Sequence, residues 1–216
     1  MTFKKLKEII KKNNIPEDVH LLSDSGWEFD ASEMNGIFYN KNRNEIVFVQ
    51  YAPFSKYLKK EEYELLYGGI VIFLDVDGVL NNDLTKDLTP IGSIGVDDEN
   101  LAQLKHLIDK TKADIVLTSD WRFDKDAVNY LNKRLSEHNL TLYDKIAISH
   151  NYEHRGKEIK AWLQQHSDVR SFVIIDDLCF PDFEKYRFSE RLIKTDAKYG
   201  LRKEDVDTVI ERLFGV

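Results

Sequence analysis

The stretch VIFLDVDGVLNN, from Val71 to Asn82, decides the fold of this chain. It opens with the apolar run VIFL, whose β-branched and aromatic side chains are typical of a buried strand. Asp75 and Asp77 follow with one residue between them, so their side chains are expected to point the same way where the strand ends. Two carboxylates on one face repel each other and need a cation or a shared proton to stay together. The stretch therefore predicts a functional site at the end of a buried strand.

Composition limits the class of protein. The chain has 216 residues, of which 42% are hydrophobic and 32% charged, which is enough for one large domain and one small module. A net charge of −7 disfavours a general binder of phosphate backbones, although it leaves room for a local basic cleft. The single cysteine, Cys179, excludes an internal disulfide and a cysteine-based zinc site. With no signal-peptide pattern and no apolar run of membrane length, we expect a cytoplasmic protein without membrane contact, and the oligomeric state stays open.

Residues 1–67 are predicted to form a small α+β module of unknown role. The segments GIFYN and EIVFVQ flank KNRN, a loop typical of a β-hairpin. The segment KYLKKEEYELLY, residues 56–67, predicts a helix, and Gly68-Gly69 a hinge into the next domain. The second predicted domain is residues 68–216.

Strand and helix patterns alternate from Ile70 onward. Strands are indicated by ADIVLTS, SFVIID and RLIKT, with DKIAIS as a further candidate, and helices by DDENLAQLKHLIDK, DKDAVNYLNKRLSEH, GKEIKAWLQQH and KEDVDTVIERL. Such alternation predicts an α/β fold, with a parallel sheet between helices. Ligands of these folds bind at the carboxyl ends of the strands.

Polar residues stand at those predicted strand ends. Asp75 and Asp77 come after VIFL, Ser119 follows DIVLT, and Asp176 and Asp177 follow FVII. A hydroxyl with its neighbouring backbone amides holds a phosphoryl oxygen, and an all-oxygen carboxylate cluster is what Mg²⁺ selects. The sequence therefore predicts a magnesium-dependent phosphate site at one edge of the sheet.

The segments DVDGVLN, IVLTS, GKEIKAWL and VIIDD resemble, in this order, the four motifs of the haloacid dehalogenase (HAD) superfamily of phosphohydrolases. The resemblance covers roughly residues 68–216. LTSDWR and the spacing from Lys157 to IIDD look closest to the phosphatase domains of RNA-repair proteins and polynucleotide kinase-phosphatases. It implies a HAD-like Rossmannoid sheet. Residues 81–113 and 122–154 are too short for an added cap domain, so we expect a capless domain with an open mouth.

The resemblance also implies roles for the acidic residues. Asp75 would be the nucleophile that forms an aspartyl-phosphate. Asp77 would protonate the leaving alcohol and then activate the water that hydrolyses the intermediate, and an acid at this position favours a phosphatase. The implied Mg²⁺ ligands are Asp75, the carbonyl of Asp77, Asp176 and Asp177.

The phosphate-binding roles come from the same resemblance. Ser119 and the amide of Asp120 would hold the phosphoryl group. Lys157 is favoured as the cation that neutralises charge on the nucleophile and the phosphate, with Arg155 as the alternative. Arg122 would be a second cation near the phosphate.

These roles imply a Mg²⁺-dependent phosphomonoesterase. An active site without a cap suits a terminal phosphate on a nucleic acid or nucleotide, and Trp121 is available to stack on a base. One alternative is a phosphatase for small molecules or proteins, gated by the N-terminal module. The other is a phosphate-binding regulatory protein without catalysis.

Overall fold

The computed structural model describes residues 3–16, 18–24, 36–49, 62–146, 154–166 and 169–214. The chain divides into two compact units. Unit 1 comprises residues 1–70 and 167–170, and unit 2 comprises residues 71–166 and 171–216. Each unit is described separately below.

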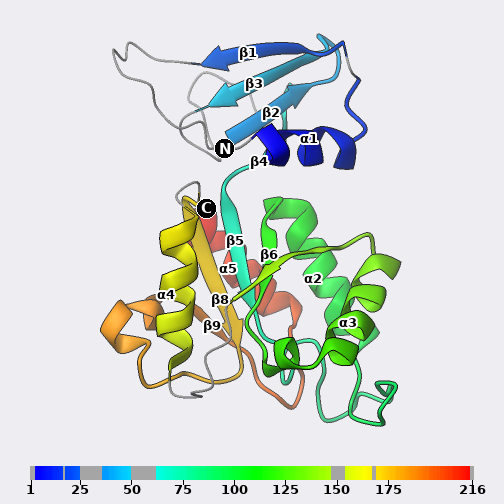
Figure 1. Cartoon of the computed structure of the whole chain (residues 1–216), viewed down its shortest axis with the longest axis vertical. Helices are drawn as coiled ribbons and strands as arrows, with labels where there is room; N and C mark the ends of the chain where they lie inside the picture. The colour runs from blue at the N-terminus through cyan, green and yellow to red at the C-terminus, as the bar shows by residue number, and fades with distance from the viewer. Residues whose placement is uncertain are drawn as a thin grey trace. The chain divides into compact units, whose positions relative to one another are not determined.

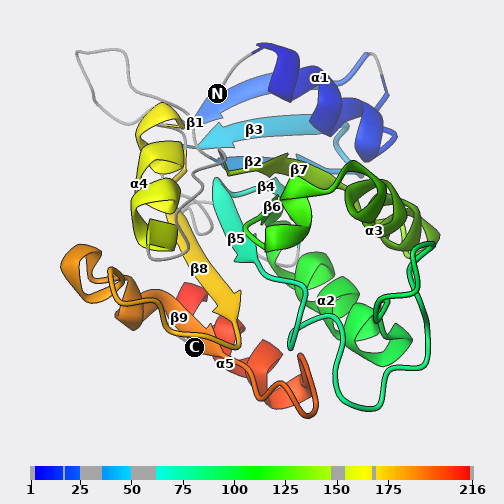
Figure 2. The same ribbon diagram turned by 60° about the horizontal axis from the view of Figure 1, so that its bottom comes forward.

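Unit 2 is built on a five-stranded parallel sheet in the order β7-β6-β5-β8-β9 (Figures 1 and 2). Its strands are β5 (Ile70–Leu74), β6 (Asp114–Leu117), β7 (Leu142–Lys145), β8 (Ser171–Asp176) and β9 (Leu192–Lys194). All residues of β5 are buried, as expected for a central strand with apolar contacts on both faces. The predicted α/β fold with a parallel sheet is confirmed.

Helices cover both faces of this sheet. They are α2 (Asp98–Thr111), α3 (Lys125–Glu137), α4 (Arg155–Gln165) and α5 (Lys203–Phe214), with short 3₁₀ helices η1 (Asp120–Phe123), η3 (Glu184–Tyr186) and η4 (Phe188–Arg191). Helix α4 lies on one face, and α5 lies on the other, where it contacts α2 (Figures 1 and 2). None of the described helices is long and apolar enough to cross a bilayer.

The strand order reverses at β5, and such a reversal is expected to form a crevice at the carboxyl ends of the strands. The chain leaves β5 for β6 on one side, whereas β8 lies on the other side of β5. In a parallel sheet the carboxyl ends at such a reversal splay apart and bind ligands. The residues that follow β5 and β8 are therefore neighbours across the crevice.

No inserted domain lies near this crevice in the described part of unit 2. Between β5 and α2 the chain forms turns and a single antiparallel bridge that pairs Leu88 with Ile94. The described residues between β6 and α4 form only η1, α3 and β7. The described residues of both gaps thus contain no added domain, as the gap lengths predicted, and residues 147–153 lie outside the described part of the chain.

Unit 1 is a small mixed sheet with a helix, in the strand order β1-β3-β2-β4. The elements are α1 (Phe3–Lys12), β1 (His20–Asp24), β2 (Gly36–Asn40), β3 (Glu45–Val49) and β4 (Glu64–Tyr67). The predicted hairpin is confirmed, because β2 and β3 pair antiparallel. The core of the module combines helix and sheet residues: Ile9, Ile15, Ile37, Ile46, Leu66 and Tyr67.

The helix predicted over residues 56–67 is wrong at its C-terminal end. Glu64–Tyr67 is a strand, β4, which pairs antiparallel with β2. Glutamate and leucine favour helices locally, but pairing with β2 places Leu66 and Tyr67 in the core. Residues 56–61 lie outside the described part of the chain.

Candidate active site

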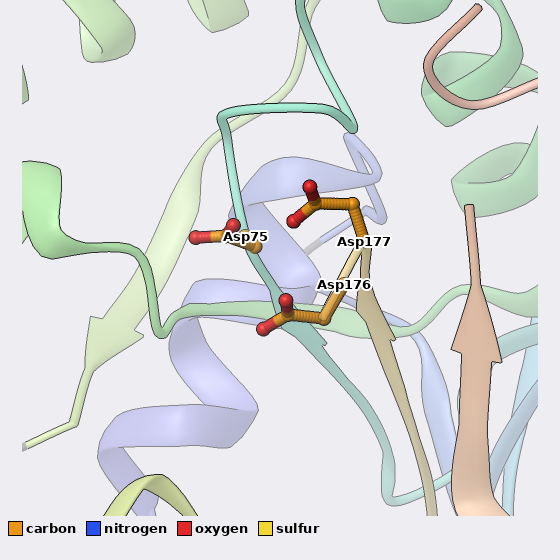
Figure 3. Close-up of side chains that lie close together, drawn as sticks. All are labelled: Asp75, Asp176 and Asp177. Atoms are coloured by element: carbon orange, nitrogen blue, oxygen red, sulfur yellow. The ribbon is translucent and has the colours of Figure 1, made fainter. Parts of the chain in front are cut away.

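Three carboxylates meet at the crevice beside β5 (Figure 3). Asp75 directly follows β5, Asp176 is the last residue of β8, and Asp177 comes next. One oxygen from each residue lies within 4.8 Å of the others. Asp75 and Asp176 are buried, with exposed fractions of 8% and 1%. Residues about 100 positions apart in sequence thus form one acidic cluster, which the topology of neighbouring strands explains.

The donor atoms of this cluster fit a hard divalent cation. Asp176 Oδ1 accepts a hydrogen bond from the Leu178 amide at 2.9 Å. Its other oxygen, Oδ2, is buried and has no hydrogen-bond partner among the described residues. Buried carboxylate oxygens without a donor are unfavourable unless a proton or a cation reaches them, and Mg²⁺ prefers such all-oxygen sites. The residues present therefore suit Mg²⁺.

The electrostatics of the cluster disfavour several negative charges together. Burial raises the pKa of Asp75 to about 6, although the charge of Arg155 and a hydrogen bond from Ser119 lower it. Burial and the charge of Asp75 raise the pKa of Asp176 to about 8. Burial also raises the pKa of Asp177. Without a cation, the folded protein therefore retains protons on Asp75 and Asp176 up to near-neutral pH.

These shifts predict how the stability of the metal-free protein depends on pH. In the unfolded chain aspartates lose their protons near pH 3.8, whereas Asp75 and Asp176 lose theirs near 6 and 8 in the folded state. Between these values the folded state binds more protons, so stability should fall as pH rises from about 4 to about 8. We expect the free energy of unfolding of chelator-treated protein, measured by urea unfolding, to fall steadily over this range. Asp176→Asn should flatten this decline, and an equally steep decline in that variant would contradict the assignment.

The turn after β5 requires its glycine. The Val76 carbonyl accepts hydrogen bonds from the amides of Val79, Leu80 and Asn81, which closes a tight turn. Gly78 lies in this turn with a φ of +68°, and a Cβ there would lie 2.7 Å from Cγ of Asp177. A side chain would therefore strain the backbone and displace a member of the carboxylate cluster.

The side chain of Asp77 is exposed and takes no part in the carboxylate cluster. Its Oδ1 accepts a hydrogen bond from Asn81 Nδ2 at 2.9 Å, and its Oδ2 accepts one from Trp121 Nε1 at 3.0 Å. The pattern of alternating residues placed Asp77 on the same face as Asp75, but these two donors hold its carboxylate at the open side of the site. The role predicted for its carbonyl in metal binding stays a prediction.

The loop after β6 brings Ser119 to the cluster. Ser119 is buried, its hydroxyl accepts from the Trp121 amide at 3.4 Å, and its side chain hydrogen-bonds to Asp75. It caps η1 at the same time. Asp120 lies on this loop as well, so the structure brings the predicted phosphate-binding loop beside the predicted nucleophile.

Arg155 is the cation that contacts the carboxylate cluster. Its Nη1 lies 3.9 Å from Asp75 Oδ1 and 3.6 Å from Asp176 Oδ2, and its Nη2 lies 3.1 Å from Asp120 Oδ1. Nη1 is buried and makes no hydrogen bond to the described residues. The guanidinium also lies over the ring of Phe180, 4.6 Å from its centroid. A buried arginine with an unused donor beside two carboxylates is ready to bind an anion.

Lys157, which the sequence favoured for this role, lies elsewhere on the first turn of α4. Its side chain is exposed, and its ammonium group forms no ion pair with the described residues. Its backbone amide donates to Asp182 Oδ2 at 2.8 Å, and the Gly156 amide donates to Oδ1 of the same residue at 3.0 Å. Asp182 thus caps α4, and the helix start presents Arg155 rather than Lys157 to the carboxylates.

Arg122 is buried and stabilises the loop after β6 through hydrogen bonds and an ion pair. Its Nη1 donates to the carbonyl of Ser119 at 2.9 Å and to Asp120 Oδ1 at 3.1 Å. Its Nη2 pairs with Glu158 Oε2 at 2.9 Å. These contacts tie the loop to α4, and the phosphate-binding role predicted for Arg122 stays a prediction.

The sequence reasoning missed three residues that shape the site. Asn81 holds Asp77, Asp182 caps α4, and Thr195 Oγ1 donates to the Gly78 carbonyl at 2.8 Å. Of these three, only Asn81 could have been predicted from the sequence, because it follows Asp77 by four positions in the same turn. Asp182 and Thr195 come from distant segments.

Comparison with known families agrees with this geometry. Residues 71–206 match a family model described as the HAD domain in Swiss Army Knife RNA repair proteins. The matched range begins in β5 and ends in α5, so it includes every residue of the carboxylate cluster. Searches of curated proteins and of solved structures gave no match.

Proposed function

The chain belongs to the family of HAD domains in Swiss Army Knife RNA repair proteins, and we propose that it is a Mg²⁺-dependent phosphomonoesterase that acts through an aspartyl-phosphate. HAD domains are usually phosphohydrolases. The observation that carries the proposal is the buried group of Asp75, Asp176 and Asp177 at the carboxyl ends of β5 and β8. A metal held by these oxygens would neutralise their charge and polarise the bound phosphoryl group.

Asp75 and Asp77 are proposed to carry out the two steps of the reaction. A carboxylate oxygen of Asp75 attacks phosphorus, while the bond from phosphorus to the ester oxygen breaks in line. Asp77 gives its proton to the departing oxygen. Water then attacks the aspartyl-phosphate, Asp77 takes a proton from this water, and inorganic phosphate leaves with Asp75 restored. Both half-reactions use the same two aspartates.

The phosphoryl oxygens need donors near Asp75. Ser119 and the amide of Asp120 are proposed to hold the phosphoryl group, because they lie on the loop that contacts Asp75. Arg155 is proposed as the cation in place of Lys157, because its Nη1 lies within 4 Å of Asp75 and Asp176 and has no hydrogen-bond partner among the described residues. Charged donors of this kind stabilise the charge that builds up on a transferring phosphoryl group.

The proposed substrate is a terminal phosphate on a nucleic acid or nucleotide. The family's description names RNA repair proteins, and no cap domain covers the crevice in the described residues. Trp121 beside Asp77 offers an aromatic ring to a terminal base. These features favour a large substrate with one exposed phosphate.

The substrate class is tested by phosphate release from matched esters. RNA and DNA oligonucleotides with a 3′- or a 5′-phosphate are compared with nucleoside monophosphates and glycerol phosphate, with Mg²⁺ and with chelator. We expect Mg²⁺-dependent release with kcat/KM at least about 10-fold higher for one class of nucleic-acid or nucleotide ends. Faster turnover of glycerol phosphate would instead identify a small-molecule phosphatase, and no turnover of any ester would favour a binding protein.

A further inference from the structure

We propose that Asn81 and Trp121 are positioning residues that fix the carboxyl group of Asp77 for proton transfer to the leaving group. The proposal rests on the function proposed above and adds two residues to it. Both residues act through Asp77, and neither needs to touch the reacting atoms.

The hydrogen-bond assignment around Asp77 is unambiguous. The indole Nε1 of Trp121 is only a donor, so Asp77 Oδ2 must accept from it. The Gly78 amide donates to Asn81 Oδ1 at 2.9 Å, which fixes the orientation of the Asn81 amide. Its Nδ2 therefore faces Asp77 Oδ1 as a donor. Each oxygen of Asp77 thus has its own donor.

The two donors come from different parts of the fold. Asn81 is buried, with 4% of its surface exposed, and belongs to the turn that carries Asp77. Trp121 belongs to η1 after β6, and its ring lies 6.1 Å from the ring of Tyr130 on α3. Asp77 is therefore tied both to its own turn and to the loop that carries Ser119.

This anchoring matters because Asp77 is exposed. An exposed aspartate without partners samples several rotamers, and a proton donor must lie within hydrogen-bond reach of the departing oxygen. Fixing the carboxyl group in advance removes the entropy cost of orienting it at the transition state. Each oxygen keeps a second lone-pair direction for the transferred proton.

Leaving-group dependence separates this role from a merely structural one. A good leaving group such as p-nitrophenolate needs little protonation, whereas phenolate needs more. Loss of a positioned acid should therefore slow phenyl phosphate much more than p-nitrophenyl phosphate. A general loss of folding or of phosphate binding would slow both esters by the same factor.

The test variant is Trp121→Phe, which removes the indole donor and keeps an aromatic ring. The matched control is Trp162→Phe, since Trp162 Nε1 makes the same kind of bond to Asp144 Oδ2, at 2.7 Å, between α4 and β7. With Mg²⁺ present, we expect Trp121→Phe to lower kcat/KM, which reports on the steps up to release of the leaving group, about 10- to 100-fold on phenyl phosphate and less than about 3-fold on p-nitrophenyl phosphate. Trp162→Phe should change both rates by one common factor.

A second comparison uses Asp77→Asn as the background. If Trp121 acts through Asp77, adding Trp121→Phe to Asp77→Asn should cause no further loss on phenyl phosphate. Equal losses on both esters, or full additivity with Asp77→Asn, would overturn the positioning role while leaving the phosphatase intact. Absence of turnover in the native protein on both aryl esters and on phosphorylated oligonucleotides and nucleotides would overturn the proposed function itself.

Discussion

Replacing Asp75 with asparagine is expected to lower kcat for phosphomonoester hydrolysis by a factor on the order of 10⁴ or more. The amide has nearly the shape of the carboxylate but is a much weaker nucleophile. Asp176 is almost fully buried and both oxygens of Asp77 accept hydrogen bonds, so neither of these two carboxylates is placed to substitute for it. The measurement is phosphate release from p-nitrophenyl phosphate in Mg²⁺, followed by trapping of the phosphorylated protein in single turnovers.

The matched control for this substitution is Asp124→Asn. Asp124 caps α3 by accepting from the amides of Asp126 and Ala127. Asparagine caps helices as well as aspartate does, so activity should stay within about 2-fold of the native value. Retention of more than about a tenth of the native kcat by Asp75→Asn would contradict its role as nucleophile.

Replacing Arg155 with methionine should lower kcat/KM by about 10²- to 10³-fold, whereas Lys157→Met should change it by less than about 3-fold. Both substitutions remove a cation from the first turn of α4, so they form a matched pair. Only Arg155 lies within 4 Å of Asp75 and Asp176. The measurement is kcat/KM on p-nitrophenyl phosphate across pH.

The pH profile adds an independent readout to this pair. The charge of Arg155 lowers the pKa of Asp75 and of Asp176. Its removal should raise both, so the acidic limb of activity should move to higher pH in Arg155→Met and stay in place in Lys157→Met. A large loss in Lys157→Met with near-native Arg155→Met would restore Lys157 as the catalytic cation.

The sequence by itself predicted the fold of unit 2 and its acidic cluster. Apolar runs that end in acids at VIFLDVD and FVIIDD predict parallel strands with carboxylates at their ends, since strand patterns are local. The topology of a parallel sheet places these carboxyl ends at one edge, so the sequence predicts that Asp75 and Asp176 lie close together. The hairpin of unit 1 could also be predicted from local sequence, because a short polar loop joins its two strands.

Contacts between segments that are distant in sequence could not be predicted from local sequence patterns. Residues 64–67 carry helix-favouring side chains, but they form β4 because β2 offers an edge to pair with. Likewise, the choice between Arg155 and Lys157 cannot be made from spacing. Residues two apart on a helix point in different directions, and the angle at which α4 meets the sheet decides which one reaches the site.

The tertiary structure alone decided how the site is held. Asp182 fixes the start of α4 and so directs Arg155 toward Asp75 and Asp176. Trp121 reaches Asp77 across 44 positions of sequence. The sequence determines which strands end in acids, because that pattern depends on local burial and pleat. The orientation of each side chain is set only by packing and hydrogen bonds between distant segments, which no local pattern encodes.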